Sequence, residues 1–276
     1  MPRDLRGRVI VITGASSGIG AATARACARA GMHVALAARR VDRLEAVAAD
    51  VRAGGGEALA VHCNVDHDAD VQRLVAEARA WRGRIDVLFA NAGYGLVAPV
   101  LDERDDAEAD ARAMFETNYW GTLRLLRLGV PVMLATSDQP HVLICSSSAS
   151  EISPPLYGHY AATKAAQDSL ACALRAELAV GDKPCPVTSV HPTGTRTEFF
   201  EASLKTVGRD PVLNTPRWAF QSADHVARCI VRALRRPRAE VWPSPLTRIG
   251  LGALTMCPGM QAWLVRQMMH RRGKAE

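Results

Sequence analysis

A tyrosine and a lysine four residues apart are the pair of side chains in this sequence most suited to chemistry. Tyr160 and Lys164 stand at the start of a predicted helix over 160–180, so both side chains project from one helical face. A phenol has a pKa of about 10 and is a poor base at neutral pH, but a nearby cation lowers that pKa by favouring the phenolate. The pair therefore predicts a tuned proton donor or acceptor.

A serine stands thirteen residues before the tyrosine, directly after the predicted strand 142–146. At that place the hydroxyl of Ser147 can hydrogen-bond a reacting carbonyl or alkoxide oxygen. Ser146 and Ser148 flank it, so a shift of one residue in register stays open. The spacing to Tyr160 favours Ser147.

A glycine-rich turn near the N-terminus predicts a phosphate-binding site. Residues 13–20 read Thr-Gly-Ala-Ser-Ser-Gly-Ile-Gly, between a predicted strand over 8–13 and a predicted helix over 21–30. Glycine permits positive φ and close approach of the backbone to a pyrophosphate, and the amides and dipole of the helix start attract anionic oxygens. An ordinary strand-to-helix turn is the less favoured alternative. The predicted cofactor contacts are Gly14, Ser16, Ser17, Gly18, Ile19 and Gly20.

The end of the second predicted strand indicates which nucleotide is preferred. A cofactor with a free ribose 2′-hydroxyl is usually bound there by Asp or Glu, but this chain has Ala38, Arg39 and Arg40. No carboxylate is present to repel a 2′-phosphate, and a guanidinium is placed to pair with one. The sequence therefore predicts that NADP is preferred over NAD. For Arg40 the alternative is that it is a solvated residue ahead of a helix.

Composition is that of an ordinary globular protein. Of 276 residues, 48% are hydrophobic and 22% charged, which argues against disorder, collagen and a heptad rod. The net charge of +6 is interpreted as a scattered excess that suits a small anionic ligand and no nucleic-acid partner. Seven widely spaced cysteines without a Cys-x-x-Cys pair predict neither disulfides nor zinc binding. With no signal-peptide core near Met1, we expect a cytoplasmic protein.

Apolar runs alternate with helical stretches along the chain. Strands are predicted at 8–13, 33–37, 58–63, 85–90, 142–146, 187–191 and 240–242, and helices at 21–30, 42–52, 69–81, 106–134, 160–180 and 222–235. The second helix has the spacing of a capping box in Asp42 and Glu45. Strands that are apolar along their whole length belong to parallel sheets covered on both faces. We predict a single-domain α/β fold, a Rossmann-like doubly wound parallel sheet of about seven strands.

Several motifs in the same order and spacing resemble the short-chain dehydrogenase/reductase family over residues 7–242. They are the glycine-rich turn, Asn91-Ala92-Gly93, Asn118, Ser147 and the pair of Tyr160 with Lys164. The resemblance implies that Tyr160 is the general acid/base and that Ser147 orients the substrate oxygen. It further implies that Lys164 holds the nicotinamide ribose and lowers the Tyr160 pKa, and that Asn118 supports a water linking Lys164 to solvent.

The resemblance also assigns further cofactor contacts. Asn64, where the family often has Asp, and Val65 lie at the adenine. The segment Pro192-Thr193-Gly194-Thr195-Arg196-Thr197 departs from the usual Pro-Gly-x-x-x-Thr, yet Thr195 and Thr197 still resemble the contacts to the nicotinamide carboxamide. Helices that hold Asn118 and Tyr160 often form a subunit interface in this family, so a homodimer or homotetramer is expected. The predicted cofactor contacts also include Asn91, Ala92, Gly93, Pro192 and Thr193.

Residues 1–245 are predicted to form the catalytic, NADP-binding domain, with a substrate lid around 194–221 because long loops of this kind are usually functional. An apolar substrate wall is predicted from aromatic and apolar residues at the same sheet edge, although they can equally pack the lid. His141, His159 and His191 have no second ligand at metal spacing and are interpreted as structural, so no metal site is predicted. The wall residues are Tyr94, Leu96, Tyr157, Phe199, Phe200 and Trp218.

Residues 246–276 form an apolar and basic extension. The stretch 249–265 lacks charge but is interrupted by Gly and Pro and is too short to span a membrane. Packing against the enzyme or a sister subunit is favoured over peripheral membrane contact through Met260, Trp263, Leu264 and Met268. Together these motifs predict an NADP(H)-dependent oxidoreductase. It would reduce a carbonyl or, in reverse, oxidise a secondary alcohol. A family member acting as epimerase or dehydratase, or an inactive NADP-binding regulatory protein, are the alternatives.

Overall fold

Seven parallel strands form the central sheet of the protein, as predicted. The computed structural model describes residues 1–180, 183–196, 220–256 and 259. The strands follow the order β3-β2-β1-β4-β5-β6-β9, and every neighbouring pair is parallel. Their bounds are β1 (Val9–Thr13), β2 (His33–Ala38), β3 (Glu57–His62), β4 (Val87–Ala90), β5 (His141–Cys145), β6 (Val187–Val190) and β9 (Glu240–Val241).

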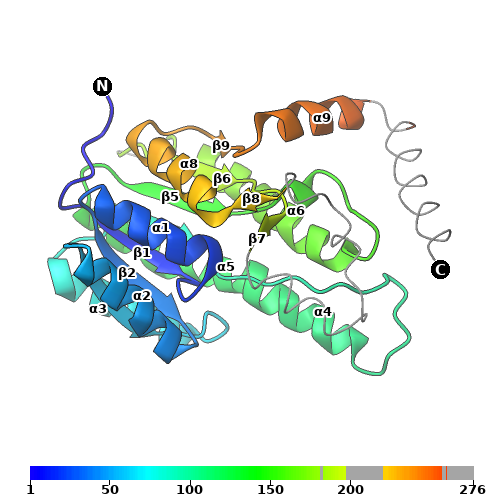
Figure 1. Ribbon diagram of the computed structural model, residues 1–276, viewed down its shortest axis with the longest axis horizontal. Coiled ribbons are helices and arrows are strands. Elements are labelled where there is room, and N and C mark those ends of the chain that lie inside the picture. The colour runs from blue at the N-terminus through cyan, green and yellow to red at the C-terminus, as the bar shows by residue number, and fades with distance from the viewer. Residues whose placement is uncertain (181–182, 197–219, 257–258, 260–276) are drawn as a thin grey trace.

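Helices cover both faces of the sheet (Figure 1). Successive side chains of a strand point to opposite faces, so Ile10 and Ile12 of β1 belong to one apolar core and Val11 to the other. The first core is closed by α1 (Gly18–Arg29), α2 (Val41–Ala53) and α8 (Ala223–Arg235), and the second by α3 (Asp68–Arg82), α5 (Gly121–Thr136) and α6 (Gly158–Glu177). Burial on both faces explains why the strands are apolar along their whole length.

The sheet reverses its winding between β1 and β4. From β1 the chain proceeds outward to β2 and β3 on one side, and β4, β5 and β6 extend the sheet on the other. In open sheets of this kind ligands bind at the carboxyl ends of the strands, where the connections on either side of the reversal diverge. Beside this edge, a short parallel pair is formed by β7 (Thr195–Arg196) and β8 (Gln221–Ser222).

Two helical predictions were wrong in detail. The predicted helix 106–134 is divided into α4 (Ala107–Phe115), the π-helical turn η1 (Glu116–Trp120) and α5; apolar periodicity cannot reveal such a turn, which inserts one extra residue into the hydrogen-bond ring. The predicted capping box is absent, because α2 begins at Val41 with Arg40 as its N-cap and Asp42 lies inside the first turn. By contrast, the Ser222 hydroxyl does cap α8 by accepting a hydrogen bond from the His225 amide.

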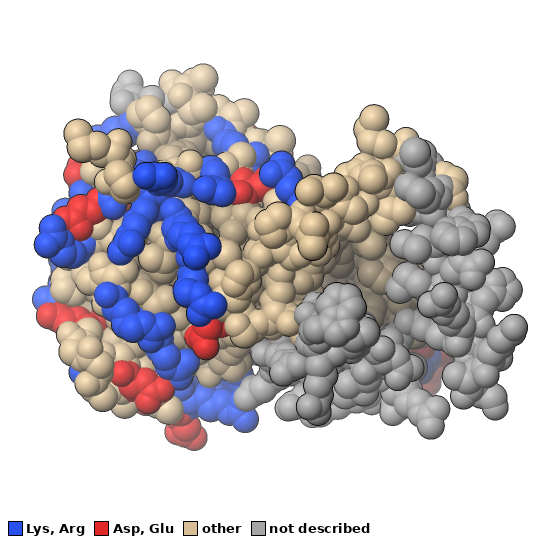
Figure 2. Space-filling view, turned by 45° about the horizontal axis from the view of Figure 1, so that its top comes forward, with Lys and Arg blue, Asp and Glu red and all other residues tan. Residues whose placement is uncertain are grey.

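Charged side chains of both signs lie on the face of the molecule shown in Figure 2. Many Lys and Arg side chains lie on the left of this view, with Asp and Glu side chains among them. Among the cysteines that the structure describes, Cys27, Cys63, Cys145 and Cys185 are buried, Cys229 is partly exposed and Cys172 is exposed.

The C-terminal extension begins with α9 (Pro245–Met256), and the predicted apolar face at 260–268 lies outside the described residues. No helix in the described part of the chain is both long and apolar enough to cross a membrane.

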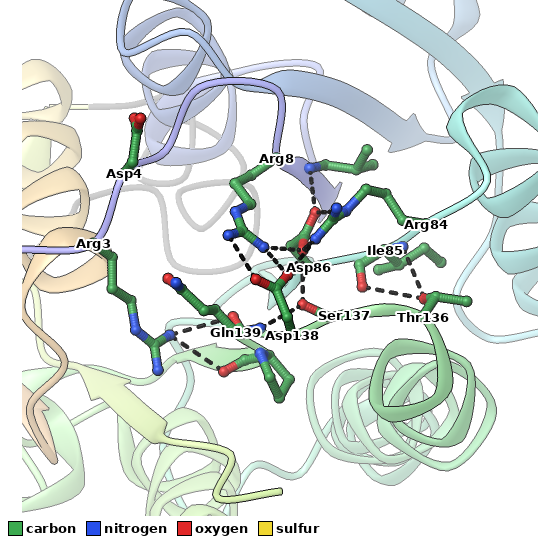
Figure 3. Close-up of polar contacts among 12 residues, drawn as sticks. Arg3, Asp4, Arg8, Arg84, Ile85, Asp86, Thr136, Ser137, Asp138 and Gln139 are labelled. Atoms are coloured by element: carbon green, nitrogen blue, oxygen red, sulfur yellow. Dashed lines mark hydrogen bonds and ion pairs between the residues drawn. The ribbon is translucent and has the colours of Figure 1, made fainter.

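A buried aspartate connects the amino-terminal ends of neighbouring strands of the sheet (Figure 3). Asp86 is 1% exposed and accepts hydrogen bonds from the Val9 amide at 2.9 Å, the Ser137 hydroxyl at 2.7 Å and the Arg84 guanidinium at 2.8 Å. Arg8 approaches the same carboxylate at 3.2 Å. Burial alone would raise the pKa of Asp86, but these hydrogen bonds outweigh it and hold the pKa below its ordinary value. The carboxylate thus joins β1, β4 and the end of α5.

We expect Asp86→Asn to lower the free energy of unfolding by about 3 kcal/mol, because it leaves the partly buried guanidinium groups and the buried Ser137 hydroxyl without their charged acceptor. Urea unfolding measures this loss. Asp138→Asn is the matched control: its carboxylate pairs with the same two arginines but its side chain is 63% exposed, so the loss stays below about 1 kcal/mol. Equal losses for the two variants would contradict the assignment.

The same site predicts a pH dependence of stability. A carboxyl whose folded-state pKa is depressed stabilises the protein above the unfolded pKa of about 3.9, and the contribution is lost as the pH falls through the lower folded value. The difference in stability between wild type and Asp86→Asn should therefore be full at neutral pH and shrink below about pH 4. A difference that stays constant on acidification would show that the charge is unimportant.

Candidate active site

A cleft of about 510 Å³ lies at the carboxyl ends of the strands. Such a volume falls in the range of small-molecule and cofactor sites. It extends from the glycine-rich turn past Arg39 and Asn64 to Tyr160 and Pro154, so the predicted nucleotide and reaction residues line one continuous space.

The predicted tyrosine and serine meet at one end of this cleft. Tyr160 is 9% exposed and Ser147 8% exposed, and their side chains are hydrogen-bonded. The Ser147 oxygen also accepts a hydrogen bond from the Ala149 amide at 3.1 Å, which leaves the serine proton for the phenol oxygen. Ser146 points elsewhere, since its hydroxyl donates to Asp168 at 2.7 Å. The geometry therefore resolves the register in favour of Ser147.

The pKa of Tyr160 is raised, which corrects the prediction that Lys164 lowers it. Burial is the largest cause, and the hydrogen bond with Ser147 lowers the pKa only in part. The Lys164 ammonium lies 5.6 Å from the centre of the Tyr160 ring but is aimed at other acceptors. In this environment the phenol is neutral at physiological pH and keeps a proton to donate.

Lys164 is itself buried, with 4% of its surface exposed. Its ammonium donates to the Cys145 carbonyl at 2.9 Å and to the Gln167 side-chain oxygen at 2.8 Å. Burial lowers the pKa of this lysine, an effect that Cys145 and Asp168 oppose. The two acceptors, from the end of β5 and the next turn of α6, fix where the ammonium lies.

Gln167 connects Lys164 to Asn118, a link that sequence reasoning missed. The Gln167 amide nitrogen donates to the Asn118 carbonyl and to the Thr122 hydroxyl, each at 2.7 Å. All of these groups are buried. Position 167 follows Lys164 by three residues and so lies on the same helical face, which was the signal available in the sequence. These contacts join Lys164 to Asn118 through this side chain.

Asn118 lies in the π-helical turn and is fully buried. Its side chain donates to the Tyr94 carbonyl and to the Thr163 hydroxyl at 2.9 Å each, and accepts from the Tyr94 amide at 3.0 Å. The turn thus places both a carbonyl for Gln167 and an amide that anchors the loop after β4. π-Turns inside α-helices are often found at functional sites.

The glycine-rich turn has the shape of an anion cradle. Gly14 has φ +64°, and a Cβ there would lie 2.8 Å from the Ala92 backbone; one at Gly20 would lie 2.4 Å from the Gly14 carbonyl. The Ser17 side chain does not cap α1, and no acidic residue stands in its first turn. Amides at the start of an uncapped helix suit phosphate oxygens, so the turn fits a dinucleotide.

Two residues at the reversal of the sheet hold this turn in place. The side-chain amide of Asn91 donates to the carbonyls of Thr13 and Gly14 at 2.9 and 3.2 Å. The Thr13 hydroxyl, also missed by the sequence reading, accepts from the amides of Asn91 and Ala92 at 3.1 Å each. Asn91 therefore supports the cradle by bonding to its backbone.

At the far end of the cleft both arginines line the wall. Arg40 is exposed, and its guanidinium donates to the hydroxyls of Ser16 and Ser17 at 3.2 and 2.7 Å, so it contacts the glycine-rich turn. Asn64 and Val65 line the same region, with the Asn64 amide donating to Asp70 at 2.8 Å. Nearby, Ala38 is 7% exposed and has no charge to offer.

The segment after β6 contributes to the lining of the cleft. Pro192, Thr193 and Thr195 line it, and the Thr195 hydroxyl donates to the Thr193 carbonyl at 2.8 Å. Thr197 and most of the predicted lid at 194–221 lie outside the described residues.

The predicted substrate wall is partly assembled. Tyr94 and Tyr157 line the cleft, whereas Leu96 packs behind it against the cluster of Val97, Met114, Tyr157 and Tyr160 and is absent from the described lining. Phe199, Phe200 and Trp218 lie outside the described residues. Before Tyr157, Leu156 adopts φ +70°, a strained backbone for leucine, and its carbonyl accepts from the Ala98 amide at 2.9 Å. Sequence reasoning also missed Ala149 and Pro154, which complete this wall.

Comparisons with known proteins agree with this geometry. The model of the short chain dehydrogenase family matches residues 8–207. An uncharacterized oxidoreductase of Listeria innocua is 29% identical over 259 residues, covering 94% of this chain and 99% of the relative. An 11-beta-hydroxysteroid dehydrogenase A of Sesamum indicum is 30% identical over 272 residues, covering 96% and 76%.

The chain belongs to the short-chain dehydrogenase/reductase family of oxidoreductases. A solved family structure from Burkholderia phymatum, in complex with NAD, superposes with a TM-score of 0.83 at 25% identity and covers 94% of this chain and 96% of its own. An alcohol dehydrogenase from Thermococcus sibiricus, complexed with 5-hydroxy-NADP, gives 0.71 at 29% identity over 85% and 94%. The fold is therefore that of this family.

We expect Gln167→Leu to lower the pKa of Lys164 further, because a hydrogen bond to a charged group is worth about 1.5–3 kcal/mol and here stabilises the ammonium. Gln167→Glu should raise it instead, since a carboxylate would face the same group. NMR titration of the lysine ε-carbons measures both, with Lys164→Arg identifying the signal. Shifts of the same sign in the two variants would refute the assignment.

Proposed function

We propose that the protein is an NADP(H)-dependent oxidoreductase that interconverts a carbonyl and a secondary alcohol. The observation that carries this proposal is the hydrogen-bonded pair of Ser147 and Tyr160 in the same cleft as the glycine-rich turn, with the Lys164 ammonium 5.6 Å from the phenol ring. A bound nicotinamide nucleotide would supply or accept the hydride. The residues that fit it are those of the turn, Arg39 and Arg40, Asn64 and Val65, and Pro192 to Thr195.

In this proposal Tyr160 transfers the proton. Because burial raises its pKa, the phenol is protonated at neutral pH and can donate to the oxygen of a carbonyl as negative charge develops there. Ser147 already donates to the phenol oxygen and would donate to the substrate oxygen, which stabilises that charge. Lys164, held by Cys145 and Gln167, contributes positive charge beside the phenol and would hold the ribose of the cofactor. The role of Asn118 is to support this lysine.

We expect Tyr160→Phe to reduce kcat by about 10²–10⁴-fold, the usual contribution of general acid–base catalysis, while the Kd for NADPH stays near the wild-type value. Absorbance of NADPH with a panel of ketones gives kcat, and fluorescence titration gives the Kd. Tyr157→Phe is the matched control, since this second tyrosine lines the same cleft and should retain most turnover. Full activity in Tyr160→Phe would refute the assignment of the acid.

Preference for NADP(H) is proposed from the charges at the end of β2. Ala38 offers no carboxylate to repel a 2′-phosphate, and Arg39 is an exposed residue at the wall of the cleft. Arg40 lies beside it, with its guanidinium on Ser16 and Ser17. Guanidinium groups bind phosphate in bidentate fashion, so this end of the cleft favours the phosphorylated ribose.

The double variant Ala38→Asp with Arg39→Ala should invert the cofactor preference. Loss of one charged hydrogen bond of about 1.5–3 kcal/mol removes one to two decades of affinity for NADPH, and the new carboxylate provides an acceptor for a free 2′-hydroxyl. The ratio of kcat/KM values for NADPH and NADH measures the change. Arg40→Ala serves for comparison, because its contacts to the turn predict weaker binding of both nucleotides. An unchanged ratio in the double variant would exclude Arg39 as the selective residue.

An apolar substrate is proposed from the apolar residues that line the cleft together with Ser147. Tyr94, Tyr157, Ala149 and Pro154 face this space, and apolar walls with few polar groups are typical of sites for hydrophobic ligands. The named activity of the Sesamum indicum relative, a hydroxysteroid dehydrogenase, is in keeping with this substrate class. Comparing kcat/KM for bulky apolar ketones with that for small polar ones tests it.

We also propose that residues 1–245 act as one catalytic unit and that the chain forms a homo-oligomer through the helices that carry Asn118 and Tyr160. Trp120, in the same π-turn as Asn118, is 47% exposed, and large exposed aromatic side chains are enriched at interfaces. Light scattering should give a mass of at least two chains. Trp120→Glu should reduce that mass, and a wild-type monomer would contradict the proposal.

A further inference from the structure

Three side chains from distant parts of the sequence converge behind the cleft. Glu151 follows the short helix η2 (Ser148–Ser150), Asp168 lies one turn after Lys164 on α6, and His191 follows β6. One potential ligand atom from each lies within 4.8 Å of the other two. This cluster is separate from the residues that line the cleft and has no part in the mechanism above.

His191 is the unusual member of the cluster. Its side chain is 3% exposed, and neither ring nitrogen has a hydrogen-bond partner among the described residues. The ring stacks on Trp242 with centroids 4.3 Å apart and an interplanar angle of 5°, so its plane is fixed. Burying polar atoms without partners costs free energy, and native proteins rarely leave such groups unsatisfied. His141, in contrast, is equally buried but bonds the Thr188 hydroxyl at 2.8 Å.

Asp168 has one oxygen committed and one directed at this histidine. Its Oδ2 accepts from the Ser146 hydroxyl at 2.7 Å. Its Oδ1 is buried, lacks a hydrogen bond in the described structure, and lies 3.7 Å from the His191 Nε2. That separation exceeds a hydrogen bond but leaves room for an ion in contact with both atoms. The exposed Glu151 completes the group from the solvent side.

We propose that Glu151, Asp168 and His191 bind a single divalent transition-metal ion of the Zn²⁺ type. One imidazole and two carboxylates match its ligand preferences, with water in the remaining position, whereas Ca²⁺ and Mg²⁺ favour oxygen ligands throughout. Metal–ligand distances of about 2.0–2.2 Å require the three atoms to approach somewhat more closely. Glu151 can make that movement because it is exposed, and Ser146 orients Asp168 as partners outside the metal sphere commonly do.

The ion would connect the loop after η2 to α6 and β6. That loop continues to Pro154 and Tyr157, which line the cleft. Metal binding therefore stabilises the folded chain and the wall of the proposed substrate site, with no ion in contact with the reacting atoms. The sequence reading assigned His191 to packing because its two partners lie 40 and 23 residues away in the chain, where no metal-binding spacing is recognisable.

Zinc binding by the full-length protein tests this site directly. After treatment with a chelator, the protein is titrated with Zn²⁺ in competition with a chromogenic chelator, and we expect one ion bound per chain. Glu151→Gln and Asp168→Asn should each weaken binding at least about tenfold, and both replacements are close in shape to the native residue. Zn²⁺ should raise the Tm of the wild type, since a ligand that binds the folded state stabilises it, and have little effect on Glu151→Gln.

The matched control changes a histidine in another pair of potential metal ligands. His225 and Cys229 lie one turn apart on α8, with Nε2 and Sγ separated by 3.9 Å, and His225→Gln should leave Zn²⁺ affinity unchanged. With Co²⁺ in place of Zn²⁺, the visible spectrum should lack thiolate charge-transfer absorption. Failure of the wild type to bind Zn²⁺, wild-type affinity in both carboxylate variants, or loss of binding in His225→Gln would overturn the proposal.

Discussion

The buried ammonium of Lys164 is the constraint around which the active site is arranged. An ionised amine removed from water is costly unless polar groups replace its solvation. Here the Cys145 carbonyl and the Gln167 side chain do so, and Gln167 is held in turn by Asn118 and Thr122. The π-turn follows from the same need, because it presents the Asn118 carbonyl to Gln167 while its side chain secures the loop after β4.

Burial also decides the protonation of the residue beside this lysine. Tyr160 lies in the same enclosed space, and the loss of solvation raises its pKa more than the Ser147 hydrogen bond lowers it. A neutral phenol that receives a hydrogen bond from serine can pass its own proton onward. Position and charge state are thus properties of the enclosed cluster and not of any one side chain.

The two ends of the parallel strands have different roles. At the amino-terminal edge, Asp86 joins strands through a carboxylate that is fully enclosed by donors, which holds β1 and β4 in place. The glycine-rich turn lies at the carboxyl ends of the same two strands, where the Asn91 side chain donates to the Thr13 carbonyl and the Thr13 hydroxyl accepts from the Ala92 amide. A sheet held at one end of its strands can carry loops of special geometry at the other, and function resides in such sites and not in the fold itself.

Local chemistry in the sequence determined the strand-and-helix alternation, the glycine-rich turn and the identities of Ser147, Tyr160 and Lys164, because apolar periodicity, glycine and short spacings depend on neighbouring residues alone. Only the tertiary structure decided the rise in the Tyr160 pKa, the bridge through Gln167, the place of Arg40 on the turn and the meeting of Glu151, Asp168 and His191. These depend on burial and on contacts between residues far apart in the chain. Solvent exclusion and long-range distance are produced by packing, and neither is encoded in any local stretch of sequence.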